Sequence, residues 1–157
     1  MNLIKKLLGT QNILLNLDVA DKEQLFTMIA AKWEQQYQIP AKEVLDCLTA
    51  REQLGSTGLG KEIAIPHARL KGLDHPVADL VRLRNPIEFD SPDGSLVMIC
   101  FVLLVPEHAT EQHLQILSNA AEILANPLFR ERLEMANSSE EIGELIQQWE
   151  PGDLNEN

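Results

Sequence analysis

Residues 51–67 read REQLGSTGLGKEIAIPH, and the order of secondary structure along this segment decides between two folds. Gly55 to Lys61 fits the G-x-x-x-x-G-K spacing of a nucleotide-binding loop, but Glu62 stands where that loop needs the hydroxyl that holds magnesium. That loop also leads from a strand into a helix. Here the apolar spacing before Gly55 is helical, and the run IAI before Pro66 predicts a strand. The order is helix, loop, strand, which excludes a nucleotide-binding loop.

The segments on either side of this loop predict alternating strands and helices. Residues 13–19 alternate apolar and polar side chains, as in a half-buried strand. Asp21 with Gln24 three residues later predicts a helix start, and Pro40 suits the first turn of a second helix that Gly55 ends. This second helix carries Arg51 to the edge of the glycine loop.

The C-terminal half predicts a hairpin followed by helices. Residues 79–84 alternate, residues 91–95 read SPDGS and predict a turn, and residues 96–105 form the most apolar run, typical of a central strand. Three helix starts follow, at Thr110, at Asn126 with Pro127, and at Ser138 with Glu141. Strands interspersed with helices and at least one antiparallel pair predict an α/β fold, with a mixed parallel and antiparallel sheet sandwiched by helices on both faces.

Length and composition predict one domain. The 157 residues are 45% hydrophobic, which suffices for a single core, expected over about residues 12–149 with a flexible tail at 150–157. The formal charge of −11 would repel a phosphate backbone, so nucleic acid is excluded as a partner. The first nine residues lack a secretory signal, and the most apolar run is too short to cross a bilayer. We therefore expect a cytoplasmic protein without membrane insertion.

His67 is the histidine whose neighbours suit chemistry. Pro66 restricts the backbone that presents it, and the loop ahead of it offers hydroxyl and backbone N–H donors, which are the groups that bind oxyanions. A neutral imidazole nitrogen is a nucleophile at physiological pH and can accept a phosphoryl group. The expected phosphoryl-binding residues of the loop are Gly55, Ser56, Thr57 and Gly58.

Arg51 and His113 are the expected supporting groups. A well-placed arginine would offset much of the charge of an incoming phosphoryl group, since opposite charges 4 Å apart gain about 4 kcal/mol at an effective dielectric of 20. His113 falls in the first turn of the helix that Thr110 caps, where the dipole disfavours positive charge and favours an anion. A neutral imidazole there would donate a hydrogen bond to the phosphoryl group.

The other reactive side chains have plainer interpretations. Cys47 and Cys100 lie in apolar patterns and are expected to be small buried hydrophobes in a reducing compartment. His75 is expected to be structural. His108 with His67, His113 and a nearby glutamate at 107 or 111 would supply zinc ligands, but the spacing of five between His108 and His113 does not suit one helix face. No cofactor or metal is expected, although a pocket that only binds an anion or a metal stays as an alternative.

The segment at 51–67, together with FVLLVPEHATEQHLQIL at 101–117, resembles the enzyme IIA components of the bacterial phosphoenolpyruvate-dependent phosphotransferase system. The resemblance is to the fructose and mannitol class, and within it to the nitrogen-regulatory IIA proteins. It implies that His67 is the phosphoryl acceptor and that Arg51 and His113 assist it. Family members more often carry glycine at position 68 and small or uncharged polar residues at 61 and 62, where this chain has Ala68, Lys61 and Glu62.

The resemblance also implies the partners and the role. A histidine-containing phosphocarrier protein would phosphorylate the chain, which would regulate target proteins according to its phosphorylation state. The alternative within the family is a transport IIA that passes the group to a fructose-like IIB protein.

Overall fold

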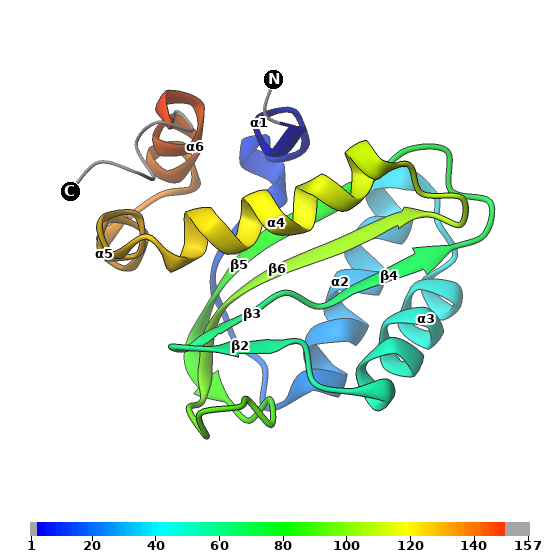
Figure 1. Ribbon diagram of the computed structural model, residues 1–157, viewed down its shortest axis with the longest axis horizontal. Helices are drawn as coiled ribbons and strands as arrows, with labels where there is room; N and C mark the ends of the chain where they lie inside the picture. The colour runs from blue at the N-terminus through cyan, green and yellow to red at the C-terminus, as the bar shows by residue number, and fades with distance from the viewer. Residues whose placement is uncertain (1–2, 150–157) are drawn as a thin grey trace.

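The computed structural model describes residues 3–149, so the tail expected at residues 150–157 lies outside the described residues. A six-stranded sheet forms the middle of the molecule in the order β1-β5-β6-β3-β2, with β4 also paired to β6 (Figure 1). The strands are β1 Ile13–Leu17, β2 Gly58–Gly60, β3 Ile63–Ala64, β4 His67–Leu70, β5 Val77–Ile87 and β6 Val97–Pro106.

The sheet is mixed, as predicted. β1 runs parallel to β5, and β3 and β4 run parallel to β6, whereas β5 pairs antiparallel with β6 across the predicted turn at residues 91–95. β3 and β4 follow one another along the same edge of β6, and Pro66 lies between them. The apolar run at residues 96–105 is therefore the central strand, paired on both edges.

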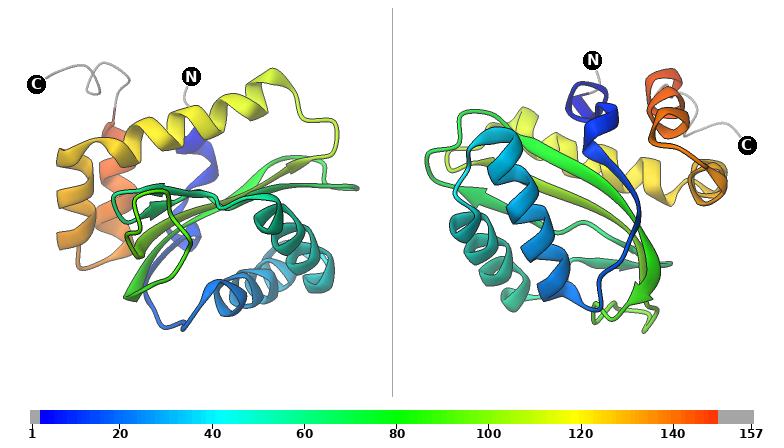
Figure 2. Two further views of the ribbon diagram at one scale, coloured as in Figure 1. Left: turned by 60° about the horizontal axis from the view of Figure 1, so that its bottom comes forward. Right: turned by 180° about the vertical axis from the view of Figure 1, so that it is seen from behind.

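Helices cover both faces of this sheet, which confirms the predicted sandwich (Figure 2). One face packs against α2 and α3, and the other against α4, α5, α6 and a short N-terminal helix, α1. The helices are α1 Leu3–Leu7, α2 Lys22–Tyr37, α3 Ala41–Leu54, α4 Glu111–Ala125, α5 Pro127–Met135 and α6 Ser139–Gln148, with a 3-10 turn at Thr10–Asn12.

Alternation along β6 divides the core into two layers. Ile99, Phe101 and Leu103 pack toward α4, whereas Cys100 and Val102 pack toward α2 and α3. Every residue from 99 to 105 is buried, because helices cover the strand on both sides. This continuous burial explains why the strand is an apolar run without polar alternation.

The predicted helix starts are confirmed in detail. The side chains of Asp21, Thr110, Asn126 and Ser138 each accept hydrogen bonds from backbone N–H groups in the first turn that follows. At its other end, α3 stops at Gly55, whose N–H donates to the carbonyl of Glu52. This stop places the last turn of α3 beside β4, since the two elements pack together (Figure 1).

Four elements were not predicted, and each is short: α1, the 3-10 turn at Thr10–Asn12, β2 and β4. α1 has five residues, and its apolar side chains pack onto the same face of the sheet as α4 and α6. β2 is a three-residue strand inside the glycine loop, paired antiparallel with β3. β4 begins at His67 itself, so this histidine is the first residue of a strand.

Candidate functional site

A cavity of about 520 Å³ opens where the last turn of α3 meets β4 and the first turn of α4. It brings together the three side chains that the sequence singled out, Arg51, His67 and His113, although they come from three different elements. Its full lining is Cys47, Ala50, Arg51, Leu54, His67, Ala68, Arg69, Leu103, Val105, His113, Leu114 and Leu117.

His67 reaches the cavity because it is the first residue of β4. The strand pairs His67 with Leu103 of β6 and continues with alternating burial, so that Ala68 and Leu70 are buried, whereas His67 is half-buried and Arg69 is exposed. A rigid strand paired with the central strand of the sheet therefore presents the imidazole.

A single hydrogen bond fixes which nitrogen of His67 is available. Nδ1 lies 2.7 Å from the backbone carbonyl oxygen of Ile65. A carbonyl only accepts hydrogen bonds, so Nδ1 carries the proton and Nε2 keeps its lone pair. Burial lowers the pKa of His67 below its ordinary value, the charge of Arg51 lowers it further, and the Ile65 carbonyl and Glu52 act in the opposite direction. His67 is thus a neutral imidazole with Nε2 as a nucleophile.

His113 has the opposite arrangement. Its Nδ1 accepts a hydrogen bond of 3.3 Å from the backbone N–H of Thr110, while its own backbone N–H donates to the Thr110 hydroxyl at 3.2 Å. This reciprocal pair is a capping box at the start of α4 in which a histidine takes the place usually held by glutamate or glutamine. An N–H only donates, so the neutral ring carries its proton on Nε2, as a donor.

Arg51 stands in the last turn of α3 and is half-buried. Its Nη1 donates to the carbonyl oxygen of Gly55 at 2.9 Å, which holds the guanidinium at the helix end. A cation at a helix C-terminus is favourable, because the helix dipole is negative there. The site therefore has a fixed positive charge beside a nucleophilic nitrogen.

The loop residues that are expected to bind the phosphoryl group lie outside this cavity. None of Gly55, Ser56, Thr57 and Gly58 lines the cavity. The hydroxyl of Ser56 donates to the carbonyl of Phe89, the backbone N–H and hydroxyl of Thr57 donate to Glu52, and the N–H of Gly58 donates to Ser56. These donors are engaged within the protein, so that the loop braces the end of α3 instead.

Two further residues line the cavity: Arg69, which the sequence did not single out, and Cys47, which was expected to be buried. Arg69 lies two residues after His67 on the same strand, so the period of two places it on the face that lines the cavity. Cys47 is only half-buried and lines the cavity as well. Burial raises the pKa of the Cys47 thiol to about 11, so this side chain stays protonated beside the histidine. Cys100 is fully buried, as predicted.

The remaining histidines lie away from this cavity. His75 and His108 are both exposed, and neither belongs to its lining. Within residues 3–149, no group of three or more histidine, cysteine, aspartate or glutamate side chains is arranged to hold a metal ion. Over the same residues, no helix combines the length and apolarity that crossing a bilayer requires.

Comparison with known proteins places the chain among close relatives. The family model described as phosphoenolpyruvate-dependent sugar phosphotransferase system, EIIA 2, matches residues 6–149. The nitrogen regulatory protein of Pseudomonas aeruginosa is 40% identical over 124 residues, which are 79% of each chain. The crystal structure of nitrogen regulatory protein IIA-Ntr from Neisseria meningitidis is 40% identical, with a TM-score of 0.86 over 92% of this chain and 99% of that one.

A more distant likeness supports the fold alone. Escherichia coli enzyme IIA for mannitol, solved in complex with phosphorylated mannitol enzyme IIB, is 21% identical, with a TM-score of 0.76 over 90% of this chain and 98% of that one.

Proposed function

We propose that this chain, which belongs to the EIIA 2 family of the phosphoenolpyruvate-dependent sugar phosphotransferase system, is a regulatory phosphoryl carrier that accepts its phosphoryl group on His67. The observation that carries the proposal is the pair of opposite tautomers in one cavity. His67 presents a bare Nε2, and His113 presents an Nε2–H donor. Two relatives that match at 40% identity are named nitrogen regulatory proteins, which supports a regulatory role.

The transfer step requires no proton to be removed from His67, because Nε2 already holds a lone pair. The Nε2 lone pair attacks the phosphorus of a phosphohistidine on the donor protein, the new N–P bond forms, and the electron pair of the broken bond returns to the donor's imidazole. Arg51 and the Nε2–H of His113 then stabilise the negative charge on the transferred oxygens, because both are preorganised groups that face the same cavity. Because Nδ1 of His67 stays bonded to the Ile65 carbonyl, the phosphorylated ring is expected to keep its orientation.

The proposed donor is a histidine-containing phosphocarrier protein in the cytoplasm. Leu54 is 85% exposed and Leu114 is 44% exposed, and both lie on the rim of the cavity. Exposed apolar side chains gathered around a site are typical of a surface that another protein covers. The rim thus suits a protein donor better than a small free metabolite.

Intact mass spectrometry tests this function. The purified chain is incubated with phosphoenolpyruvate and the two general phosphotransferase proteins, and an acid-labile gain of one phosphoryl group is expected. No gain with donors that phosphorylate a control IIA protein would refute the proposal and favour a pocket that only binds an anion. Adding a fructose-type IIB protein then tests the transport alternative, since rapid loss of the group to IIB would contradict a purely regulatory role.

A further inference from the structure

Glu52 is a buried carboxylate that the proposed transfer step does not use. Its side chain is 7% exposed, and both oxygens are occupied by donors. Oε2 accepts from the ammonium of Lys22 at 2.9 Å and from the backbone N–H of Thr57 at 3.0 Å, and Oε1 accepts from the hydroxyl of Thr57 at 2.6 Å. A buried charge needs hydrogen-bond donors of this kind to be tolerated in a folded protein.

These contacts continue to the nucleophile through two backbone carbonyls. The carbonyl of Thr57 accepts from the N–H of Ile65 at 3.0 Å, and the carbonyl of Ile65 accepts from Nδ1 of His67 at 2.7 Å. The chain of hydrogen bonds therefore runs from Glu52 through Thr57 and Ile65 to His67.

We propose that Glu52 is a positioning residue that fixes the nucleophilic tautomer of His67 by clamping Thr57. The inference rests on the proposed function of His67 as phosphoryl acceptor. Ile65 lies between β3 and β4 and is itself unpaired with β6, although the carbonyl of Pro66 next to it accepts from the N–H of Leu103 at 2.9 Å. The N–H of Ile65 donates to the carbonyl of Thr57, and Thr57 in turn donates its own N–H and its hydroxyl to Glu52, which adds to the pairing of Gly58 with Ala64 next to them. A loosened Thr57 would let the Ile65 carbonyl turn away from the ring, and Nδ1–H would lose its preference over Nε2–H.

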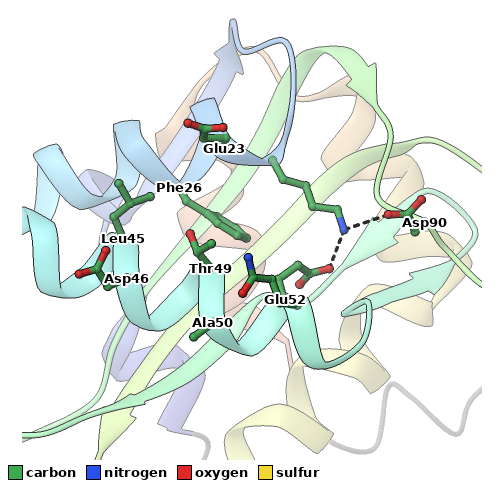
Figure 3. A pocket seen from close by; sticks show the side chains of 10 residues that line it. Glu23, Phe26, Leu45, Asp46, Thr49, Ala50, Glu52 and Asp90 are labelled. Atoms are coloured by element: carbon green, nitrogen blue, oxygen red, sulfur yellow. Dashed lines mark hydrogen bonds and ion pairs between the residues drawn. The ribbon is translucent and has the colours of Figure 1, made fainter.

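Lys22, at the start of α2, holds the Glu52 carboxylate that bonds to Thr57, and we call the contacts among these three residues the clamp. Glu52 and Lys22 lie in an open cleft of about 860 Å³ between α2 and α3, where the ammonium also approaches Asp90 at 3.6 Å (Figure 3). Asp46 lines the same cleft on the same helix, yet it pairs with Lys42 and takes no part in the chain to His67. It is therefore the matched control for removing one negative charge from this surface.

The experiment compares ring tautomers and transfer rates. Nitrogen-15 NMR of the unphosphorylated protein reports which ring nitrogen of His67 carries the proton, and single-turnover transfer from the phosphorylated phosphocarrier protein reports the rate. The variants are Glu52→Gln and Thr57→Val, with Thr57→Ser and Asp46→Asn as controls that keep the clamp. Thr57→Val serves as an independent route, because it leaves the Glu52 charge in place to pair with Lys22.

Wild type and both controls are expected to show a single Nδ1–H tautomer. Glu52→Gln and Thr57→Val are expected to show a mixture, with transfer slowed on the order of 10- to 100-fold at an unchanged half-saturating concentration of phosphocarrier protein. Unchanged tautomers in both variants, or a changed tautomer with transfer at the wild-type rate, would overturn the inference. If the wild-type protein takes no phosphoryl group at all, the proposed function fails by itself, whereas the ring spectra still decide whether Glu52 sets the tautomer.

Discussion

Replacing Arg51 with alanine separates charge compensation from stability. The guanidinium makes one hydrogen bond, to the Gly55 carbonyl at the end of α3, in a setting where a neutral partner is easily replaced by water. Losing such a bond costs about 1 kcal/mol of folding free energy. Removing one preorganised donor from a developing oxyanion costs about 10²- to 10³-fold in rate, or roughly 2.7–4 kcal/mol. The variant should therefore lose far more in transfer than in stability.

The assay measures both quantities on the same protein. Single-turnover phosphoryl transfer gives the rate, and urea unfolding gives the free energy of unfolding. Arg132→Ala is the control, because Arg132 is exposed on α5 and lies outside the cavity. Arg51→Lys is expected to fall between wild type and Arg51→Ala, since lysine keeps the charge without the planar fork. A transfer rate for Arg51→Ala within about threefold of wild type, a change of under 1 kcal/mol, would refute the role given to this side chain.

The remaining predictions concern the two histidines and a strained turn. His113→Ala should still accept the phosphoryl group, because the nucleophile remains, but transfer should slow by roughly 10- to 100-fold on the scale of a lost oxyanion donor. Complete loss of acceptance by a folded variant would contradict this supporting role. The lowered pKa of His67 means that the folded protein releases the ring proton more readily than the unfolded chain. The contribution of His67 to the free energy of unfolding is therefore present above the ordinary histidine pKa of about 6.5 and is lost as pH falls through the folded pKa. An NMR titration of the ring should give a midpoint below 6.5, and a midpoint above that value would contradict the burial argument. Lys61 and Glu62 form the turn between β2 and β3 with φ angles of 55° and 68°. The double change Lys61→Asn and Glu62→Gly suits such a turn and should stabilise the fold by about 1–2 kcal/mol in thermal unfolding. A lower melting temperature would show that the two side chains contribute more to stability than their backbone strain costs.

Local patterns predicted the elements that bury a large apolar face. The β5 to β6 hairpin, the central position of β6 and the starts of α2, α4, α5 and α6 were all predicted, because period and cap residues act within a few positions of one another. β2 and β4 escaped prediction, since a three-residue strand of Gly-Leu-Gly and a four-residue strand opened by His67 are held by pairing to distant strands and not by their own propensity.

The sequence singled out the three side chains that meet in the cavity, but it did not predict the contacts of the loop beside them. Arg51, His67 and His113 were singled out by position and chemistry, and the fold brings them into one cavity. The loop donors at Ser56 and Thr57 had the right chemistry for an anion, but they bond to Phe89 and to Glu52. Those partnerships depend on how α3 and the β5 to β6 turn pack against the loop, and no local pattern reports that packing.

The position of the phosphorus tests the central claim most directly. The chain is phosphorylated with nitrogen-15 in its histidine rings, and phosphorus–nitrogen couplings in the NMR spectrum identify the bonded nitrogen. The hydrogen bond from Nδ1 to the Ile65 carbonyl predicts one phosphorus, bonded to Nε2 of His67, and none in His67→Ala. A coupling to Nδ1 of His67, or to a ring nitrogen of His113 in the wild-type protein, would contradict the account.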